Sequence, residues 1–294
     1  MGKSVVTVNL AVAMARRGQR CVLVDADLGG ANLHTLLGVR KPDRTLSHYL
    51  NADIAKLSAV MCETPFPNLW LISGCDALLE MANPKYSQKQ KLLRNLRHLD
   101  VDHVLLDLGA GSAFNVLDFF IEAQHQILVV VPEPTSIENT YHFLKAAFYR
   151  WLRKAAREFG VREAIERVLG EETRRRVRSP RELIEAVLRV DPVAGQALLE
   201  RARAFSPMLV VNQTRTPEHR RVGWEISQAC RDYLDMEVRY LGDLQRDDCV
   251  LEAVSQRQPV LHIAPHSPFS RDLEEIVLRL SELEALPPSH GTAR

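Results

Sequence analysis

The sequence has few features of a secreted or membrane-spanning protein. Its five cysteines are odd in number and scattered, and none forms a C-x-x-C pair. This pattern favours a reducing compartment and argues against a zinc or iron–sulfur site. No apolar stretch approaches the roughly 20 residues that span a bilayer, and no signal peptide is visible. We therefore predict a cytoplasmic protein that reaches a membrane, if at all, peripherally.

Bulk charge and histidine spacing exclude further classes. The net charge is +1, so overall electrostatics give no support for a DNA-binding protein or a binder of acidic ligands. The ten histidines show no H-E-x-x-H or comparable spacing, so no histidine metal centre is predicted. With 294 residues, 46% of them apolar, the chain can form one large α/β domain or one domain with a helical insertion.

The first residues, Gly2-Lys3-Ser4, have the sequence that closes a phosphate-binding loop at the start of a helix. In such a loop backbone N–H groups face an anion, the lysine reaches the β- and γ-phosphates, and the serine hydroxyl ligates Mg²⁺. A helical pattern follows at once and ends near Gly18. The alternative is an ordinary flexible N-terminus.

Two apolar runs lead into carboxylates. Cys21–Val24 reads as a buried strand that delivers Asp25 and Asp27, and Val104–Leu106 delivers Asp107 before a glycine-rich segment. Open α/β sheets place ligands at such strand ends. Two aspartates two positions apart on an extended segment project to one side and repel one another unless a cation relieves them. Mg²⁺-nucleotide would supply that cation, and a capping or turn role is the alternative.

Strands alternate with helices along most of the chain, which predicts a doubly wound, mostly parallel sheet. Further strands are expected at Asn68–Ile72, Ile127–Val131, Met208–Val211 and Val238–Leu241, and helices around Leu46–Leu50, from Ser87 as N-cap through Leu99, and near Ser270–Leu286.

A basic helical region interrupts this alternation. We expect an N-terminal part at 1–145, a helical insertion at 146–206, a C-terminal part at 207–286 and a disordered tail at 287–294. Between Arg150 and Phe205, 14 Lys or Arg stand against 9 Asp or Glu, so the insertion is net basic. Its densest cluster contains Arg174, Arg175, Arg176, Arg178 and Arg181. This cluster is either a solvated helical face or a patch for a partner or nucleic acid.

In their order, these motifs resemble the MinD/ParA group of deviant-Walker P-loop ATPases, most closely the flagellar number and placement regulators called FlhG or FleN. The resemblance is carried by GKS at 2–4, VDADLGGANL at 24–33, LLDLGAG at 105–111, VVVPEPTSI at 129–137 and VVNQ at 210–213. It implies an ATP-binding, slowly hydrolysing regulator of cellular positioning or assembly. It also implies an ATP-dependent homodimer and an unidentified protein partner.

The resemblance also implies roles for individual residues. The nucleotide-binding set is Gly2, Lys3, Ser4, Val5 and Asn212, and the Mg²⁺ set is Ser4, Asp25 and Asp107. Lys3 and Asp27 are the catalytic candidates, Lys3 as a phosphate clamp and Asp27 as the group that orients the attacking water. Asn212 offers an amide donor and acceptor to the adenine edge; a plain turn at the strand end is its alternative.

The chain departs from the family pattern in two places. Family members carry K-G-G-V-G-K-[ST] after an apolar strand, whereas here that strand, both early glycines and the signature lysine are missing. We expect an N-terminally truncated chain, with Met1 read from an internal GTG valine codon. A natural short form that binds nucleotide or a partner without hydrolysis is the alternative. Gln245 also replaces the proline of a G-x-[IL]-P-x-D-like loop.

Two related functions are disfavoured. Iron–sulfur carriers on this fold are disfavoured because the segment after Asp107 contains no cysteine. A membrane-binding C-terminal helix of the MinD type is disfavoured because the polar positions of the last helix are mainly acidic, which anionic lipid would repel. We expect its apolar stripe to pack on the sheet instead.

Overall fold

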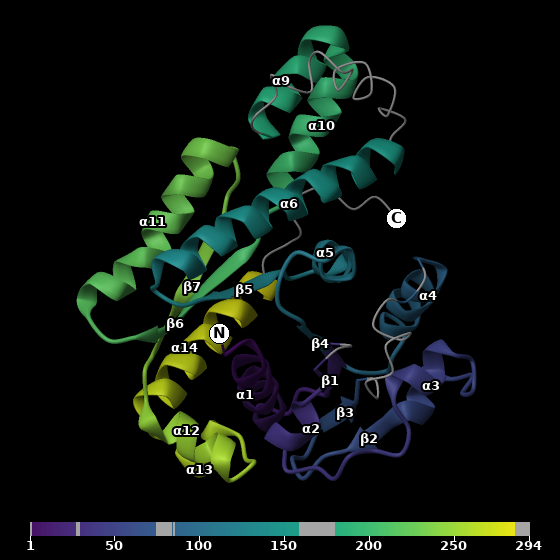
Figure 1. Ribbon diagram of the computed structural model, residues 1–294, viewed down its shortest axis with the longest axis vertical. Helices are drawn as coiled ribbons and strands as arrows, with labels where there is room; N and C mark the ends of the chain where they lie inside the picture. The colour runs from purple at the N-terminus through teal and green to yellow at the C-terminus, as the bar shows by residue number, and fades with distance from the viewer. Residues whose placement is uncertain (1, 28–29, 75–83, 85, 159–179, 286–294) are drawn as a thin grey trace. The chain divides into compact units, whose positions relative to one another are not determined.

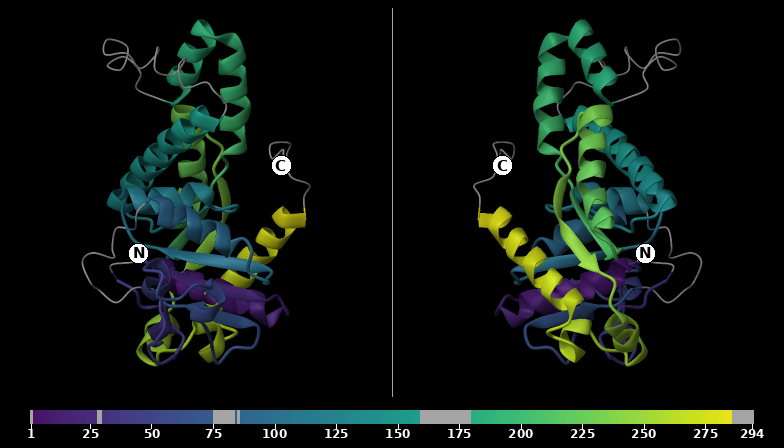
Figure 2. Two further views of the ribbon diagram at one scale, coloured as in Figure 1. Left: turned by 90° about the vertical axis from the view of Figure 1, so that its right-hand side faces the viewer. Right: turned by 90° about the vertical axis from the view of Figure 1, so that its left-hand side faces the viewer.

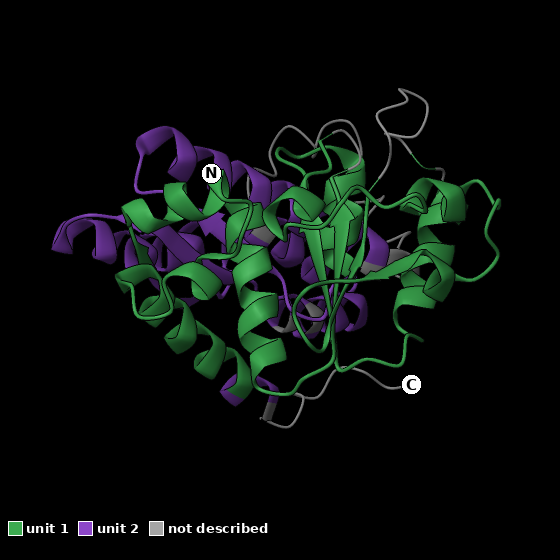
Figure 3. Cartoon of the chain, turned by 90° about the horizontal axis from the view of Figure 1, so that it is seen from below, with its two compact units in different colours: residues 1–122, 244–281 green, residues 123–243, 282–294 purple. Residues whose placement is uncertain are grey.

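The computed structural model describes residues 2–27, 30–74, 84, 86–158 and 180–285. It contains two compact units, coloured separately in Figure 3. Unit 1 comprises Met1–Glu122 and Leu244–Ser281, and unit 2 comprises Ala123–Asp243 and Glu282–Arg294. The arginine cluster at 174–178 and the predicted tail at 287–294 lie outside the described residues. The domain boundaries expected from the sequence stay predictions.

Unit 1 has the following elements, labelled in Figure 1: α1 (Lys3–Arg16), β1 (Cys21–Ala26), α2 (Leu33–Leu36), α3 (Leu46–Leu50), the 3₁₀ turn η1 (Leu57–Val60), β2 (Met61–Glu63), β3 (Leu69–Ile72), α4 (Tyr86–Leu96), β4 (His103–Leu108), α5 (Phe114–Glu122), α12 (Asp248–Ser255), α13 (Val260–Ile263) and most of α14 (Pro268–Ala285).

The sheet of unit 1 places its two acidic strands side by side. Its strand order is β2-β3-β1-β4, with β1 parallel to both β3 and β4 and only β2 antiparallel. All residues of β1 are buried, as expected for a strand covered on both faces. Asp25 on β1 is in register with Asp107 on β4, so the sheet brings these two carboxylates to one edge.

Helix α1 is anchored to unit 1 by a buried asparagine as well as by its apolar side chains. Asn9 is 1% exposed; its Oδ1 accepts a hydrogen bond from the Leu261 N–H at 3.0 Å, and its Nδ2 donates to the Val5 carbonyl at 2.8 Å. Leu261 belongs to α13, far along the sequence. One amide side chain therefore ties the start of the chain to its C-terminal part.

Unit 2 has a smaller sheet of order β5-β6-β7, with β5 (Ile127–Val130) parallel to β6 (Met208–Thr214) and β7 (Arg239–Gln245) beside β6. Its helices are α6 (Pro134–Glu158), α9 (Pro180–Val190), α10 (Pro192–Ala204) and α11 (Pro217–Leu234). Figures 1 and 2 show α9 and α10 packed together beside α6. An aromatic cluster of Phe148, Trp151 and Phe205 joins α6 to the end of α10.

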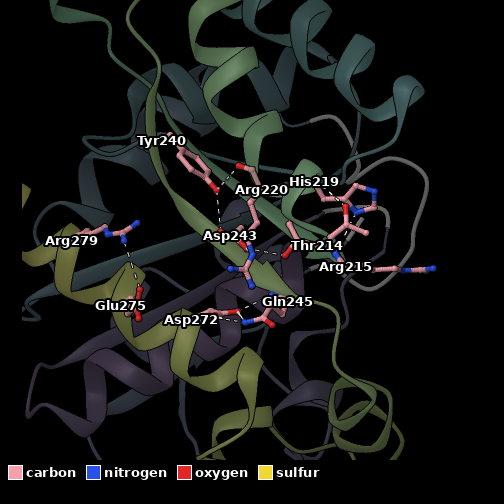
Figure 4. A network of polar contacts seen from close by, with 11 residues as sticks. Thr214, Arg215, His219, Arg220, Tyr240, Asp243, Gln245, Asp272, Glu275 and Arg279 are labelled. Carbon is pink, nitrogen blue, oxygen red and sulfur yellow. Dashed lines mark hydrogen bonds and ion pairs between the residues drawn. The ribbon is translucent and has the colours of Figure 1, made fainter.

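A polar cluster closes the end of the unit 2 sheet (Figure 4). The Asp243 carboxylate accepts hydrogen bonds from Thr214 Oγ1 at 2.9 Å and from the Tyr240 hydroxyl at 3.2 Å, and Arg220 lies 3.4 Å away. The Tyr240 ring packs directly on Gly223 of α11, where a Cβ would lie 2.3 Å from the ring. Only glycine fits at this helical position without moving the tyrosine.

Several element boundaries differ from the sequence predictions. Ser87 is not the N-cap of its helix, because α4 already begins at Tyr86. Asn68 has a left-handed φ of 62° and precedes β3, so that strand begins one residue later than predicted. The prediction of a loop directly after Leu241 is wrong for residues 242–245, because strand β7 continues to Gln245. The Gln245 N–H then donates to Asp272 at 2.9 Å (Figure 4), which a proline could not do.

The final helix was predicted near Ser270–Leu286 and is observed as α14 at Pro268–Ala285, while the packing of its apolar stripe on the sheet stays a prediction. In α14 the apolar stripe of Leu273, Ile276, Val277 and Leu280 is buried. Among the described helices, none combines the length and apolar character needed to cross a bilayer.

The Asn9 anchor gives a stability prediction. Asn9→Ala should leave the buried Leu261 N–H unpaired and lower the free energy of unfolding by about 1–3 kcal/mol, measured by urea titration. Gln256→Ala is the control, because it removes an exposed hydrogen bond in the same unit, which the Gln256 side-chain amide donates to Glu252 at 3.1 Å. This control should change stability by less than about 0.5 kcal/mol. Equal stabilities for the two variants would contradict the assigned role.

Candidate functional site

The start of α1 can receive an anion. Gly2 precedes the helix with φ 92° and ψ 9°, a left-handed conformation that glycine adopts without strain. Gly2 has no side chain that could cap the first turn, and within the described helix no acidic residue lies in that turn. The N–H groups of the first turn and the positive end of the helix dipole are therefore available to a phosphate.

Asp107 lies beside this helix start. It is 3% exposed, and the Thr7 hydroxyl on α1 donates to its Oδ1 at 3.4 Å. Burial raises the pKa of Asp107, while the Ser4 hydroxyl, the Lys3 charge and Thr7 oppose that increase. The predicted site residues Lys3 and Ser4 are thus brought to Asp107. Thr7 was missed from the sequence, although residues three apart share a helix face and its spacing from Ser4 could have indicated it.

Asp25 is the most buried carboxylate of the group, at 1% exposure. Its Oδ2 accepts hydrogen bonds from the N–H groups of Asn32 at 2.8 Å and Leu33 at 3.0 Å. Its Oδ1 is buried and has no hydrogen-bond partner among the described residues. Burial raises the pKa of Asp25 to about 6; the backbone bond from Leu33 lowers it, and the nearby Asp107 charge raises it further.

Asp27 lies between two glycines just beyond β1. A Cβ on Gly109 would be 3.1 Å from Asp27 Oδ1, and a Cβ on Gly30 would be 3.4 Å from Oδ2. The glycine-rich segment after Asp107 therefore passes directly against the Asp27 carboxylate. Gly111 in the same segment has φ 85°, which confirms that this position favours glycine.

Gly74 is a further site residue that the sequence did not reveal. A Cβ at this position would lie 2.6 Å from Ala31 Cβ and 2.9 Å from the Asp25 carbonyl oxygen. The chain after β3 therefore passes so close to Asp25 that only glycine fits. An isolated glycine after a strand carries no signal of such an approach.

These residues fit a magnesium-bound phosphate. Ser4, Asp25 and Asp107 supply the oxygen ligands that Mg²⁺ prefers, and the unpaired Oδ1 of Asp25 lacks the positive partner that a buried carboxylate needs. Within the described residues, no group of three or more His, Cys, Asp or Glu is arranged to hold a metal ion alone. A cation here would need additional ligands, and phosphate oxygens and water are the usual ones for Mg²⁺.

The remaining predicted residue, Asn212, belongs to unit 2. It is 6% exposed within β6, and its Oδ1 accepts a hydrogen bond from the Gln213 N–H at 3.0 Å. Gln213 has φ 61°, so the backbone bends at this residue. The structure thus describes Asn212 in its own unit only, and its contact with adenine stays a prediction, as does the contact of Val5 with nucleotide.

Comparison with known families identifies the chain. A family model described as "ParA: NUBPL iron-transfer P-loop NTPase" matches residues 1–147, half of the sequence. The chain belongs to the MinD/ParA family of P-loop NTPases. The iron transfer named in that description is a property of the family model, and the segment of this chain after Asp107 contains no cysteine.

Two family members resemble nearly the whole chain. "Antiactivator FleN" from Pseudomonas aeruginosa is 26% identical over 295 aligned positions, which cover 99% of this chain and 86% of that protein. "Flagellum site-determining protein YlxH" from Helicobacter pylori is 23% identical, with coverage of 97% and 79%. The resemblance to flagellar regulators noted from the motifs therefore extends over the full sequence.

A solved structure of the family shows the same fold. The septum site-determining protein MinD from Pyrococcus horikoshii, solved with Mg-ADP, matches with a TM-score of 0.62 and 20% identity. The match covers 97% of this chain and 92% of MinD. It confirms the predicted α/β fold with mostly parallel sheets.

The raised pKa of Asp25 gives a pH prediction. The folded, metal-free chain holds this proton up to about pH 6, whereas an unfolded aspartate releases it near 3.8. The associated stability is therefore present below pH 4 and is lost as the pH rises towards 6. Asp25→Asn should flatten this decline and raise the free energy of unfolding at pH 7.5 by about 1–3 kcal/mol, measured by urea titration in EDTA. A variant with the pH profile of the parent would contradict the assignment.

Proposed function

We propose that this protein is a Mg²⁺-dependent, ATP-binding regulator of cellular positioning or assembly that hydrolyses ATP slowly. The observation that carries the proposal is the buried pair Asp25 and Asp107, in register on adjacent strands beside the uncapped start of α1. The two buried carboxylates favour a bound cation, whereas the helix start, the lysine and the serine beside them favour an anion, and a metal-bound phosphate combines the two.

The proposed roles follow from the surroundings of each residue. Lys3 and the N–H groups of the first turn of α1 hold the phosphates, and Ser4, Asp107 and Asp25 hold Mg²⁺, which when bound neutralises developing phosphate charge. Asp27 orients the attacking water from its place against Gly109. Phosphoryl transfer of this kind depends on positioning and charge stabilisation rather than on covalent catalysis.

The biological role is proposed from the relatives. Two proteins that match almost the full length are named as a flagellar antiactivator and a flagellum site-determining protein. We infer control of flagellar number or placement, exerted by an ATP-dependent homodimer on a protein partner. Asn212 is proposed to recognise adenine through its side-chain amide.

A second candidate is a binding module that holds nucleotide without hydrolysing it. Such a module would bind Mg-ATP and a partner but release no phosphate. Measured phosphate release separates the two candidates.

Asp27 gives the test of the catalytic proposal. Asp27→Ala should lower ATP turnover at least about 100-fold, because a positioned group that acts on the nucleophile typically contributes that much. Affinity for Mg-ATP should stay within about threefold, since the role is assigned to the water and not to ground-state binding. Phosphate release, calorimetry and size-exclusion chromatography measure turnover, affinity and an expected accumulation of dimer.

Asp53→Ala is the matched control, because it removes the same charge from an exposed position in the same unit. It should leave all three measurements unchanged. Normal turnover in Asp27→Ala would remove Asp27 from the catalytic role, and Mg-ATP binding without phosphate release in the parent chain would favour the binding module.

A further inference from the structure

A buried lysine connects α4 with the beginning of α5. Lys89 is 6% exposed, and its ammonium donates to Asn115 Oδ1 at 2.9 Å and to the carboxylate of Asp118. Asp118 is itself 8% exposed. A charged pair with so little solvent requires well-defined geometry to offset the cost of desolvation.

The two partners of Lys89 lie in the first turns of α5, immediately after the glycine-rich segment. That segment runs from Gly109 to Ala113, and the first backbone bond of α5 joins the Leu117 N–H to the Ala113 carbonyl at 3.1 Å. At its other end the segment leaves β4 and passes against Asp27. Its path is therefore determined by two attachments, the sheet at one end and the start of α5 at the other.

Helix α4 is itself held in place by the segment that follows Asp27 in sequence. Gln88 Nε2 donates to the Leu50 carbonyl of α3 at 2.9 Å, Asn95 donates to the Tyr49 hydroxyl, and the Lys91 ammonium lies 5.3 Å from the Tyr49 ring centre. The α4 helix thus links α3, which follows Asp25 and Asp27, to α5, which follows Asp107.

We propose that Lys89 is a positioning residue that, through Asn115 and Asp118, sets the place of the glycine-rich segment against Asp27. The role in catalysis rests on the proposed ATPase function; the role in holding the segment does not. Asp27 and Gly109 are in close contact, so a shift of α5 by a fraction of an ångström displaces N–H groups that would face a γ-phosphate. Misplacement of about 1 Å can cost as much as 100-fold in rate.

The same two helices offer a matched control at their far ends. Arg97, directly after α4, pairs with Glu122 at the end of α5 at 3.1 Å. Arg97→Ala removes a contact between the same elements away from the glycine-rich segment.

Lys89→Met alone leaves Asp118 buried without its cation and can unfold the chain, so the test variant is Lys89→Met combined with Asp118→Leu. Replacing both members of a buried pair by apolar residues is often neutral for stability.

Hydrogen exchange on the full chain without nucleotide tests the positioning directly. In the folded double variant, amides of residues 109–118 should exchange at least about tenfold faster than in the parent. In Arg97→Ala these amides should be unchanged. Parental exchange over 109–118 in the double variant would overturn the proposal.

ATP turnover then tests the consequence for catalysis. The double variant should lose about tenfold in kcat with KM within about twofold, because misplacement acts on the reacting geometry and not on ground-state binding. Arg97→Ala should keep the parental kcat, and an unchanged kcat in the double variant would overturn the catalytic part. If the parent chain releases no phosphate, the proposed ATPase function fails, and hydrogen exchange still decides whether Lys89 holds the segment.

Discussion

The structure of the site depends on the burial of two carboxylates that the sheet holds side by side. Asp25 and Asp107 are in register on neighbouring parallel strands, and both are almost fully buried. Burial raises the pKa of Asp25 to about 6, with a smaller contribution from the Asp107 charge, and burial also raises the pKa of Asp107. The two buried negative charges are stabilised by positive charge close to them. The Lys3 ammonium, the N-terminus of α1 and a bound cation can each supply it.

Close packing around this pair explains the glycines of the site. Gly74 lies against Asp25 and Ala31, and Gly109 and Gly30 lie against Asp27. A Cβ at Gly74 would clash with Ala31 and the Asp25 backbone, a Cβ at Gly109 would crowd Asp27, and a Cβ at Gly30 would only reach ordinary contact with Asp27. The glycines therefore allow chain segments to approach the carboxylates closely, so that backbone groups rather than bulky side chains surround the position proposed for the phosphates.

In unit 1, helix α4 contacts two other helices through residues that lie outside the family motifs. It contacts α3 through Gln88 and Asn95 and α5 through Lys89. Helices α3 and α5 are therefore joined through α4. A displacement of α3 or α5 is expected to be transmitted to the other through α4, because close-packed interiors have low compressibility and transmit strain.

The sequence by itself determined the local elements that carry the candidate site residues, and it predicted the chemistry proposed for them. The apolar run before Asp25, the glycine after α1 and the Gly-Lys-Ser start predicted β1, α1 and the phosphate-binding role, because these signals depend on neighbours in the chain. The mostly parallel fold and the family were predicted from the order of the motifs and are confirmed. The sequence did not predict element boundaries that depend on strand pairing, such as the extension of β7 to Gln245.

Only the tertiary structure decided which distant residues meet. The contact of Thr7 with Asp107, the close approach of Gly74 to Asp25 and the pairing of Lys89 with Asp118 join residues from different elements. No local pattern encodes such contacts, because they arise from the register of the strands and the packing of helices on them. The pKa values of the aspartates likewise depend on burial, which a residue acquires only when the rest of the chain closes around it.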